Sequence, residues 1–100
     1  MYMHFGGVGF DWDEGNLQKV AERMHPAIAE LAFRGSPYVA DDPLHSMEEK
    51  RWMLINQVED RHVFVIFTKR KERIRIITAR FMHSKEVKGY EKEFSKESGN

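Results

Sequence analysis

The chain has 100 residues, of which 41% are apolar and 32% charged, and its formal net charge at pH 7 is zero. This length and composition predict one globular domain over residues 1–100, with a core at about residues 10–94 and loosely attached ends at 1–9 and 95–100. No apolar run approaches the roughly 20 residues that span a bilayer, and the start shows no signal-peptide pattern, so we expect a cytoplasmic protein without membrane contact. Cysteine is absent, which excludes disulfides and thiolate metal sites.

Charge is unevenly distributed along the chain. Residues 1–50 hold 4 Lys and Arg and 9 Asp and Glu, a balance of −5, whereas residues 51–100 hold 12 and 7, a balance of +5. Two interpretations follow from this pattern. Either folding mixes the two halves in space, or the C-terminal half presents a basic face to nucleic acid or to an acidic partner.

The first predicted elements are a short extended segment at residues 10–12 and a helix over residues 14–24. Asp13 occupies the N-cap position, where its carboxylate accepts from free backbone N–H groups. Trp12 and Leu17 occupy the two positions of a hydrophobic staple around that cap. Apolar residues at i, i+3, i+4 and i+7 make this helix amphipathic.

A second helix is predicted directly afterwards. Pro26 suits its first turn, and Gly35 is a suitable residue for its end. Residues 38–40 then form a brief strand at most, and residues 41–46 have the composition of a loop.

The second half of the chain predicts three strands and a closing helix. The strands cover residues 52–58, 63–68 and 73–81, and their short polar connections favour antiparallel pairing. The middle strand is almost entirely apolar, which is typical of a central strand covered on both faces. Ser84 caps the helix, whose inner stripe is formed by Val87, Tyr90 and Phe94. The predicted fold class is therefore α+β: a small antiparallel sheet of three to four strands, packed by two N-terminal helices and one C-terminal helix.

The last predicted strand carries arginines among its apolar residues. Period-2 alternation places Arg73 and Arg75 on one face and Arg80 on the other, while the apolar positions exchange faces midway. A β-bulge, a strong twist or an edge where the core ends explains such an exchange. We expect Arg80 to emerge away from Arg73 and Arg75, so that they form two separate basic spots. Guanidinium groups bind phosphate oxygens two at a time, which indicates a polyanionic ligand.

Several short motifs follow one another in a fixed order. They are W-D-E-G-N within residues 10–16, D-P-x-H-S-x-x-E-x-R at 42–51, F-T-x-R at 67–70, I-R-x-I-[ST]-A-R at 74–80, and the closing-helix residues 82–87 and 90–91. Together they resemble the motifs of the BrnT family of bacterial toxins over about residues 10–94.

The resemblance implies a type II toxin with a compact RelE-like fold. It implies a metal-independent endoribonuclease that inhibits translation and growth, with RNA as substrate and no cofactor. It also implies a BrnA-like ribbon-helix-helix antitoxin, operator DNA bound only through the antitoxin complex, and a homodimer or a toxin–antitoxin heterotetramer.

Cleavage of RNA without a metal requires a base for the 2′-hydroxyl, an acid for the leaving 5′-oxygen, and cations for the phosphorane charge. The sequence has no metal-ligand motif and no Gly-rich phosphate loop. Arg75 and Arg80 are the first candidates for phosphate binding and transition-state charge. Glu49 and Arg51 are candidates for a general base and a cation, and His45 has an ordinary pKa near neutrality. The candidate RNA-binding residues are Arg70, Arg73, His83, Lys85 and Tyr90.

Structural roles are open for the same residues. Arg75 and Arg80 are equally explained by salt bridges to the acidic N-terminal half, Glu49 with Arg51 by an ion pair that orients the loop, and Tyr90 by core packing. The chain would then be a non-catalytic nucleic-acid-binding and antitoxin-binding module acting as a corepressor, or a plain interaction domain. The enzyme hypothesis requires that Arg75 and Arg80 are not both locked against carboxylates with no open concavity beside them.

Overall fold

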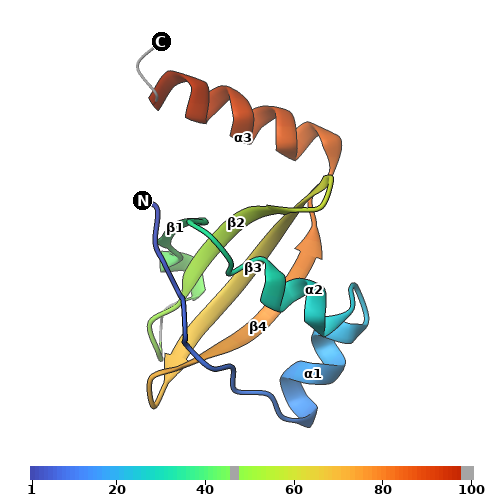
Figure 1. Ribbon diagram of the computed structural model, residues 1–100, viewed down its shortest axis with the longest axis vertical. Helices are drawn as coiled ribbons and strands as arrows, with labels where there is room; N and C mark the ends of the chain where they lie inside the picture. Colours follow the sequence, from blue (N-terminus) through green and yellow to red (C-terminus); the bar gives the residue numbers. More distant parts are fainter. Residues whose placement is uncertain (46–47, 98–100) are drawn as a thin grey trace.

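The computed structural model describes residues 1–45 and 48–97, which form one sheet with two helices on one face and a third helix beyond one end (Figure 1). The elements are α1 (Glu14–Ala21), α2 (Pro26–Leu31), β1 (Tyr38–Asp41), the 3-10 helix η1 (Pro43–His45), β2 (Trp52–Val58), β3 (Arg61–Arg70), β4 (Arg73–Phe81) and α3 (Ser84–Glu97). The strands are antiparallel in the order β1-β2-β3-β4. The predicted α+β class is confirmed. Among the described helices, none is long and apolar enough to cross a membrane.

Helix α1 begins where the sequence predicts. The Asp13 carboxylate accepts from the backbone N–H groups of Gly15 and Asn16 at 3.0 and 3.3 Å, and the Asn16 side chain accepts from Asp13 N at 2.8 Å. This reciprocal capping satisfies N–H groups that lack partners at a helix start.

The same helix ends at Ala21, three residues earlier than predicted, because the next helix needs its own cap. His25 is extended, with φ −63° and ψ 131°, and its Nδ1 accepts from Ala27 N at 3.1 Å. A residue before proline is disfavoured in the helical region, so His25 cannot continue α1 into Pro26.

The strand register assigns the side chains to two faces of the sheet. Val39, Leu54, Val65 and Ala79 are paired in one row across the four strands, and all are buried. They face α1 and α2, so we refer to this side as the helix-covered face. The core on this face comprises Phe5, Val20, Met24, Ala29, Ala32, Phe33, Val39, Leu54, Val58, Val63, Val65, Phe67, Ile74, Ile76 and Ala79.

The N-terminal segment, predicted to be loosely attached at residues 1–9, contacts the core through Phe5, while most of its other residues are exposed. Phe5 is 7% exposed, and its ring centroid lies 5.1 Å from that of Phe33 and 5.7 Å from that of Phe67. The backbone is also held, since Gly9 O accepts from Ile74 N at 2.9 Å. Burial of an aromatic side chain therefore fixes a glycine-rich stretch that has no secondary structure of its own.

The register between β3 and β4 contains the irregularity that the sequence indicated. It shifts between Ile66 and Phe67, where β4 holds one extra residue, Ile77. Of the three explanations that the sequence left open, the structure therefore has the bulge. An inserted residue changes which face every later side chain of the strand occupies.

This change overturns the predicted separation of the arginines onto opposite faces. Arg75 is the partner of Thr68, and Arg80 is the partner of Phe64. Thr68 and Phe64 are four residues apart in β3, so their side chains point to the same face of the sheet. Arg75 and Arg80 therefore lie on one face of the sheet, together with Arg73. Four strand steps separate Arg75 from Arg80, which is roughly 13 Å along the sheet, so they still form two spots.

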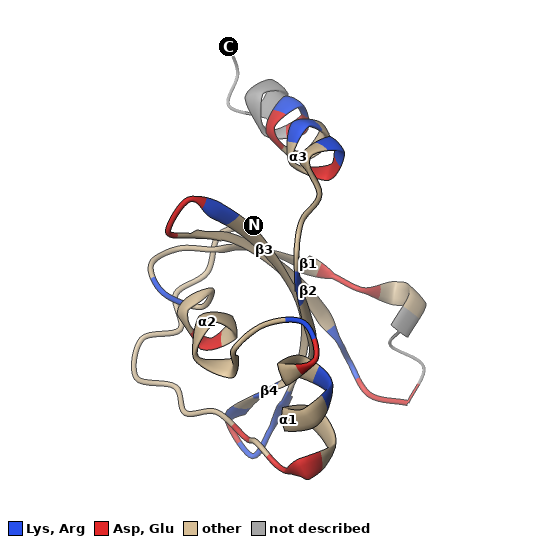
Figure 2. Ribbon diagram, turned by 90° about the vertical axis from the view of Figure 1, so that its right-hand side faces the viewer, with Lys and Arg blue, Asp and Glu red and all other residues tan. Residues whose placement is uncertain are grey.

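The face that carries the arginines is not covered by α1 or α2, which both lie on the other side of the sheet (Figure 2). We refer to it as the open face. By register it carries Tyr38, Ala40, Met53, Ile55, Gln57, His62, Phe64, Ile66, Thr68, Arg70, Arg73, Arg75, Thr78 and Arg80. The middle of β3 is nevertheless buried on both faces, as predicted for a central strand, since Ile66 and Thr68 on the open face are 8% and 2% exposed.

Helix α3 reaches the open face at one end. The ring of Tyr90 lies 6.4 Å from that of Tyr38 and 5.9 Å from that of His62. Val87 is half-buried, and the side chain of Phe94, the third residue of the predicted stripe, lies outside the described part of the chain. The helix therefore contacts the sheet through a short part of its length.

Candidate functional site

Three predicted site residues meet where segment 48–51 crosses the open face. Thr68 Oγ1 donates to Lys50 O at 2.7 Å, which fixes the segment against β3. Glu49 Oε1 then lies 3.3 Å from Arg70 Nη2 and 3.7 Å from Arg51 Nη2. We refer to Glu49, Arg51 and Arg70 as the Glu49 cluster. One carboxylate is flanked there by two guanidinium groups.

Arg75 lies near this cluster but is held by other carboxylates. Its side chain is 11% exposed, its Nη1 lies 3.0 Å from Asp13 Oδ2 and 3.8 Å from Asp11 Oδ1, and its Nη2 donates to Asp13 Oδ1 at 3.1 Å. The hydrogen bond with Asp13 raises the pKa of Arg75, and attraction by Asp11 and Glu49 adds to it. The same bond holds the pKa of Asp13 below its ordinary value. This is the salt bridge to the acidic N-terminal half that the sequence left open.

The sequence did not identify Asp11 and Asp13 as partners of Arg75. They reach it because residues 9–11 lie along the outer edge of β4, where Asp11 N donates to Ile74 O at 2.8 Å. The available signals were the cap position of Asp13 and the excess of acid in the first half. The opening W-D-E-G-N motif and the I-R-x-I motif are therefore neighbours in space.

Arg80 forms the second basic spot, at the α3 end of the open face. Its Nη1 and Nη2 each donate to one oxygen of Glu86 at 2.8 Å, and its Cζ lies 4.9 Å from the ring centroid of Phe64. The Glu86 hydrogen bonds raise the pKa of Arg80. The bond from Arg80, followed by a 2.9 Å bond from His83 N, lowers the pKa of Glu86 to about 2. The sequence did not single out Glu86.

The remaining predicted site residues are dispersed. Tyr90 packs on the α3 end of the open face, whereas Arg73 and Lys85 are exposed. His83 contributes its backbone N–H to Glu86. His45 ends η1, but its side chain lies outside the described part of the chain.

The two leading arginines are thus both paired with carboxylates, which the sequence left open, and three hollows that are lined by described residues lie away from them. In this structure, the guanidinium groups of Arg75 and Arg80 both donate to carboxylates instead of being open to a phosphate. Within residues 1–45 and 48–97, no three His, Asp or Glu side chains are grouped so as to hold a metal ion.

Comparison with known proteins identifies a family. A family model described as "Ribonuclease toxin, BrnT, of type II toxin-antitoxin system" matches residues 12–86, which are 75 of the 100 residues. The matched range includes the Glu49 cluster, both arginine spots and the carboxylate partners Asp13 and Glu86, whereas Asp11 lies one residue before it. No curated protein and no solved structure matches the chain. The chain therefore belongs to the BrnT family of ribonuclease toxins, whose type II toxin–antitoxin systems imply an antitoxin partner.

Proposed function

We propose that this toxin cleaves RNA on the open face without a metal ion, and that it thereby stops translation and growth. The observation that carries the proposal is the Glu49 cluster, where one carboxylate lies within 3.7 Å of two guanidinium groups on the uncovered side of the sheet. The proposed arrangement needs no other cation, because arginine is always charged and matches the geometry of phosphate.

RNA binding on this face requires phosphates to replace Asp13 and Glu86 as partners of the arginines. The side chains of Asp13 and Glu86 are 58% and 35% exposed, so both carboxylates have room to turn toward water. Exposed ion pairs contribute only about 0–1 kcal/mol, and the pair of Arg75, whose side chain is 11% exposed, is the harder one to separate. Charge-assisted, bidentate hydrogen bonds to phosphate are among the strong ones. The carboxylates then hold the guanidinium groups of Arg75 and Arg80 in position until RNA arrives.

The chemistry assigns one role to each member of the Glu49 cluster. Glu49 takes the proton of the 2′-hydroxyl while the 2′-oxygen attacks the phosphorus. Arg51 and Arg70 stabilise the negative charge of the phosphorane. The bond to the 5′-oxygen breaks, which leaves a 2′,3′-cyclic phosphate and a 5′-hydroxyl. His45 remains the sequence-based candidate for the acid that protonates the leaving oxygen. Arg73, His83, Lys85 and Tyr90 are proposed to contact the RNA on either side.

The direct test is incubation of purified protein with RNA in the presence of EDTA. We expect the wild type to produce fragments that end in 2′,3′-cyclic phosphate, and Glu49→Gln to cut on the order of 100-fold more slowly, as general-base loss does. Arg75→Ala and Arg80→Ala should also relieve growth arrest on induced expression. Arg23→Ala, an exposed arginine between α1 and α2, is the matched control. A folded variant as active as the wild type removes that residue from the site, and intact RNA with the wild type refutes the proposal.

A second candidate is a non-catalytic corepressor, and the pairing of Arg75 and Arg80 with carboxylates favours it. Such a protein leaves RNA intact and shifts operator DNA only when the antitoxin is present. Gel-shift experiments with the toxin alone, the antitoxin alone and the complex distinguish the two functions.

A further inference from the structure

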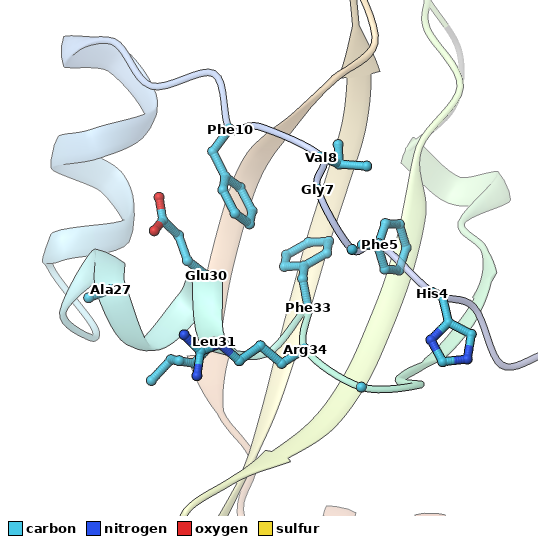
Figure 3. A pocket seen from close by; sticks show the side chains of 12 residues that line it. His4, Phe5, Gly7, Val8, Phe10, Ala27, Glu30, Leu31, Phe33 and Arg34 are labelled. Carbon is cyan, nitrogen blue, oxygen red and sulfur yellow. The ribbon is translucent and has the colours of Figure 1, made fainter.

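A hollow of about 600 Å³ lies between the N-terminal segment and α2, on the helix-covered side of the molecule (Figure 3). Its aromatic wall consists of Phe5, Phe10 and Phe33. The Phe33 centroid lies 5.1 Å from that of Phe5 and 5.4 Å from that of Phe10, in edge-to-face contacts. Because the rings support one another, the wall is preformed. Ala27 lies at its α2 rim.

A second hollow, of about 400 Å³, adjoins the first. The two share Leu31, Arg34 and Gly35, and the second continues to the β2–β3 turn at Glu59. Together they form a groove that passes along the end of α2, which we refer to as the α2 groove. Gly7 and Gly35, in the two loops that bound the groove, have φ of +80° and +68°, a conformation that glycine adopts without strain.

Arg34 is the charged residue among the three that line both hollows. It is exposed, and its guanidinium makes no ion pair with any residue in the described ranges. The carboxylate of Glu30, on the groove wall, accepts from Trp12 Nε1 at 2.7 Å. The α2 groove thus combines an apolar pocket with an adjacent unpaired cation.

We propose that the α2 groove binds an extended segment of the antitoxin. In this complex an apolar side chain of the segment enters the hollow lined by Phe5, Phe10 and Phe33, and an acidic side chain pairs with Arg34. That the partner is an antitoxin follows from the family match. That its segment carries an apolar and an acidic side chain follows from the residues that line the groove. RNA fits this surface poorly, since strong binding of nucleic acid needs several cations and Glu30 places a carboxylate in the wall.

The position of the groove has two consequences. It lies across the sheet from the open face, so a segment seated there anchors the antitoxin without itself occupying the proposed RNA site. One wall is built by residues 4–10, which lie outside the matched family range of 12–86. The family match therefore does not cover this wall, and its contact with the antitoxin is part of the proposal.

The test compares the affinity of the purified antitoxin for toxin variants by isothermal titration calorimetry. Ala27→Trp narrows the aromatic hollow from its exposed rim, and Arg34→Glu reverses the charge. We expect each variant to bind at least about tenfold more weakly. Ala21→Trp and Arg23→Glu make the same changes at exposed positions outside the groove and should bind as the wild type does. Circular dichroism confirms that each variant is folded.

Three results overturn the inference. The first is that Ala27→Trp and Arg34→Glu are both folded and bind the antitoxin with the affinity of the wild type. The second is loss of RNA cleavage in these variants with unchanged antitoxin binding, which would assign the groove to nucleic acid. The third is a wild-type homodimer in sedimentation that the variants abolish, which would assign it to a second copy. If the wild type fails to cleave RNA but the variants still bind the antitoxin more weakly, the proposed function fails and the groove assignment stands.

Discussion

Asn16 joins α1 to β4, and replacing it by alanine tests how the surroundings of Arg75 are held together. The side chain is 5% exposed. Its Nδ2 donates to Asp11 O and to Ile76 O, both at 3.0 Å, and its Oδ1 accepts from Asp13 N at 2.8 Å. These bonds fix the start of α1 against the edge of β4, where Asp13 pairs with Arg75.

The magnitude follows from these three bonds. Each hydrogen bond contributes a net 0.5–1.5 kcal/mol to stability, about 1.5–4.5 kcal/mol for three. The buried carbonyl of Ile76 loses its partner in the variant, which places the expected loss near the middle of this range, at about 3 kcal/mol. For a domain of this size each kcal/mol corresponds to roughly 4–8 °C in Tm, so Asn16→Ala should melt roughly 12–24 °C lower.

The assay is thermal and urea unfolding followed by circular dichroism. Gln18→Ala, an exposed substitution in the same helix, is the control and should change the free energy of unfolding by less than about 0.5 kcal/mol. A loss below about 1 kcal/mol in Asn16→Ala would refute the reasoning, because it would mean that water replaces the side chain at no cost.

Three further outcomes are expected. Phe67→Ala should lower the free energy of unfolding by about 3–5 kcal/mol in urea titrations, because Phe67 is 1% exposed; a loss below about 1.5 kcal/mol would show that the core collapses around it. Asn56→Ala should lose about 1–2 kcal/mol in the same experiment, since Asn56 Nδ2 donates to two carbonyls at the end of α2; an unchanged urea midpoint would contradict this. The Glu86 carboxyl should titrate near pH 2 by NMR, and in Arg80→Gln nearer its ordinary value of 4.5. Because the pKa of Glu86 is lower in the folded state, the stability from this pair is complete above about pH 4.5 and is lost as the pH falls toward 2. A titration midpoint of Glu86 that is unchanged in Arg80→Gln would contradict this prediction.

Local patterns in the sequence determined most of the elements. β2 and β4 have the predicted bounds, because each is a segment rich in apolar residues with polar residues close to both ends. Asp13 starts α1, since its carboxylate caps N–H groups only a few residues away. The exchange of apolar positions along β4 indicated the bulge at Ile77. Each of these features depends on residues that are close together in the sequence.

Tertiary structure decided how the candidate site is assembled. Arg75 and Asp13 are 62 residues apart, and only the pairing of residues 9–11 with β4 brings them together. Phe5 is buried because folding places Phe33 and Phe67 against it. The position of the bulge decided that Arg80 shares a face with Arg75. Contacts of this kind depend on strand register and helix packing, which local residue spacing does not encode. The sequence therefore identified Arg75 and Arg80 but not Asp13 and Glu86, the carboxylates that hold them.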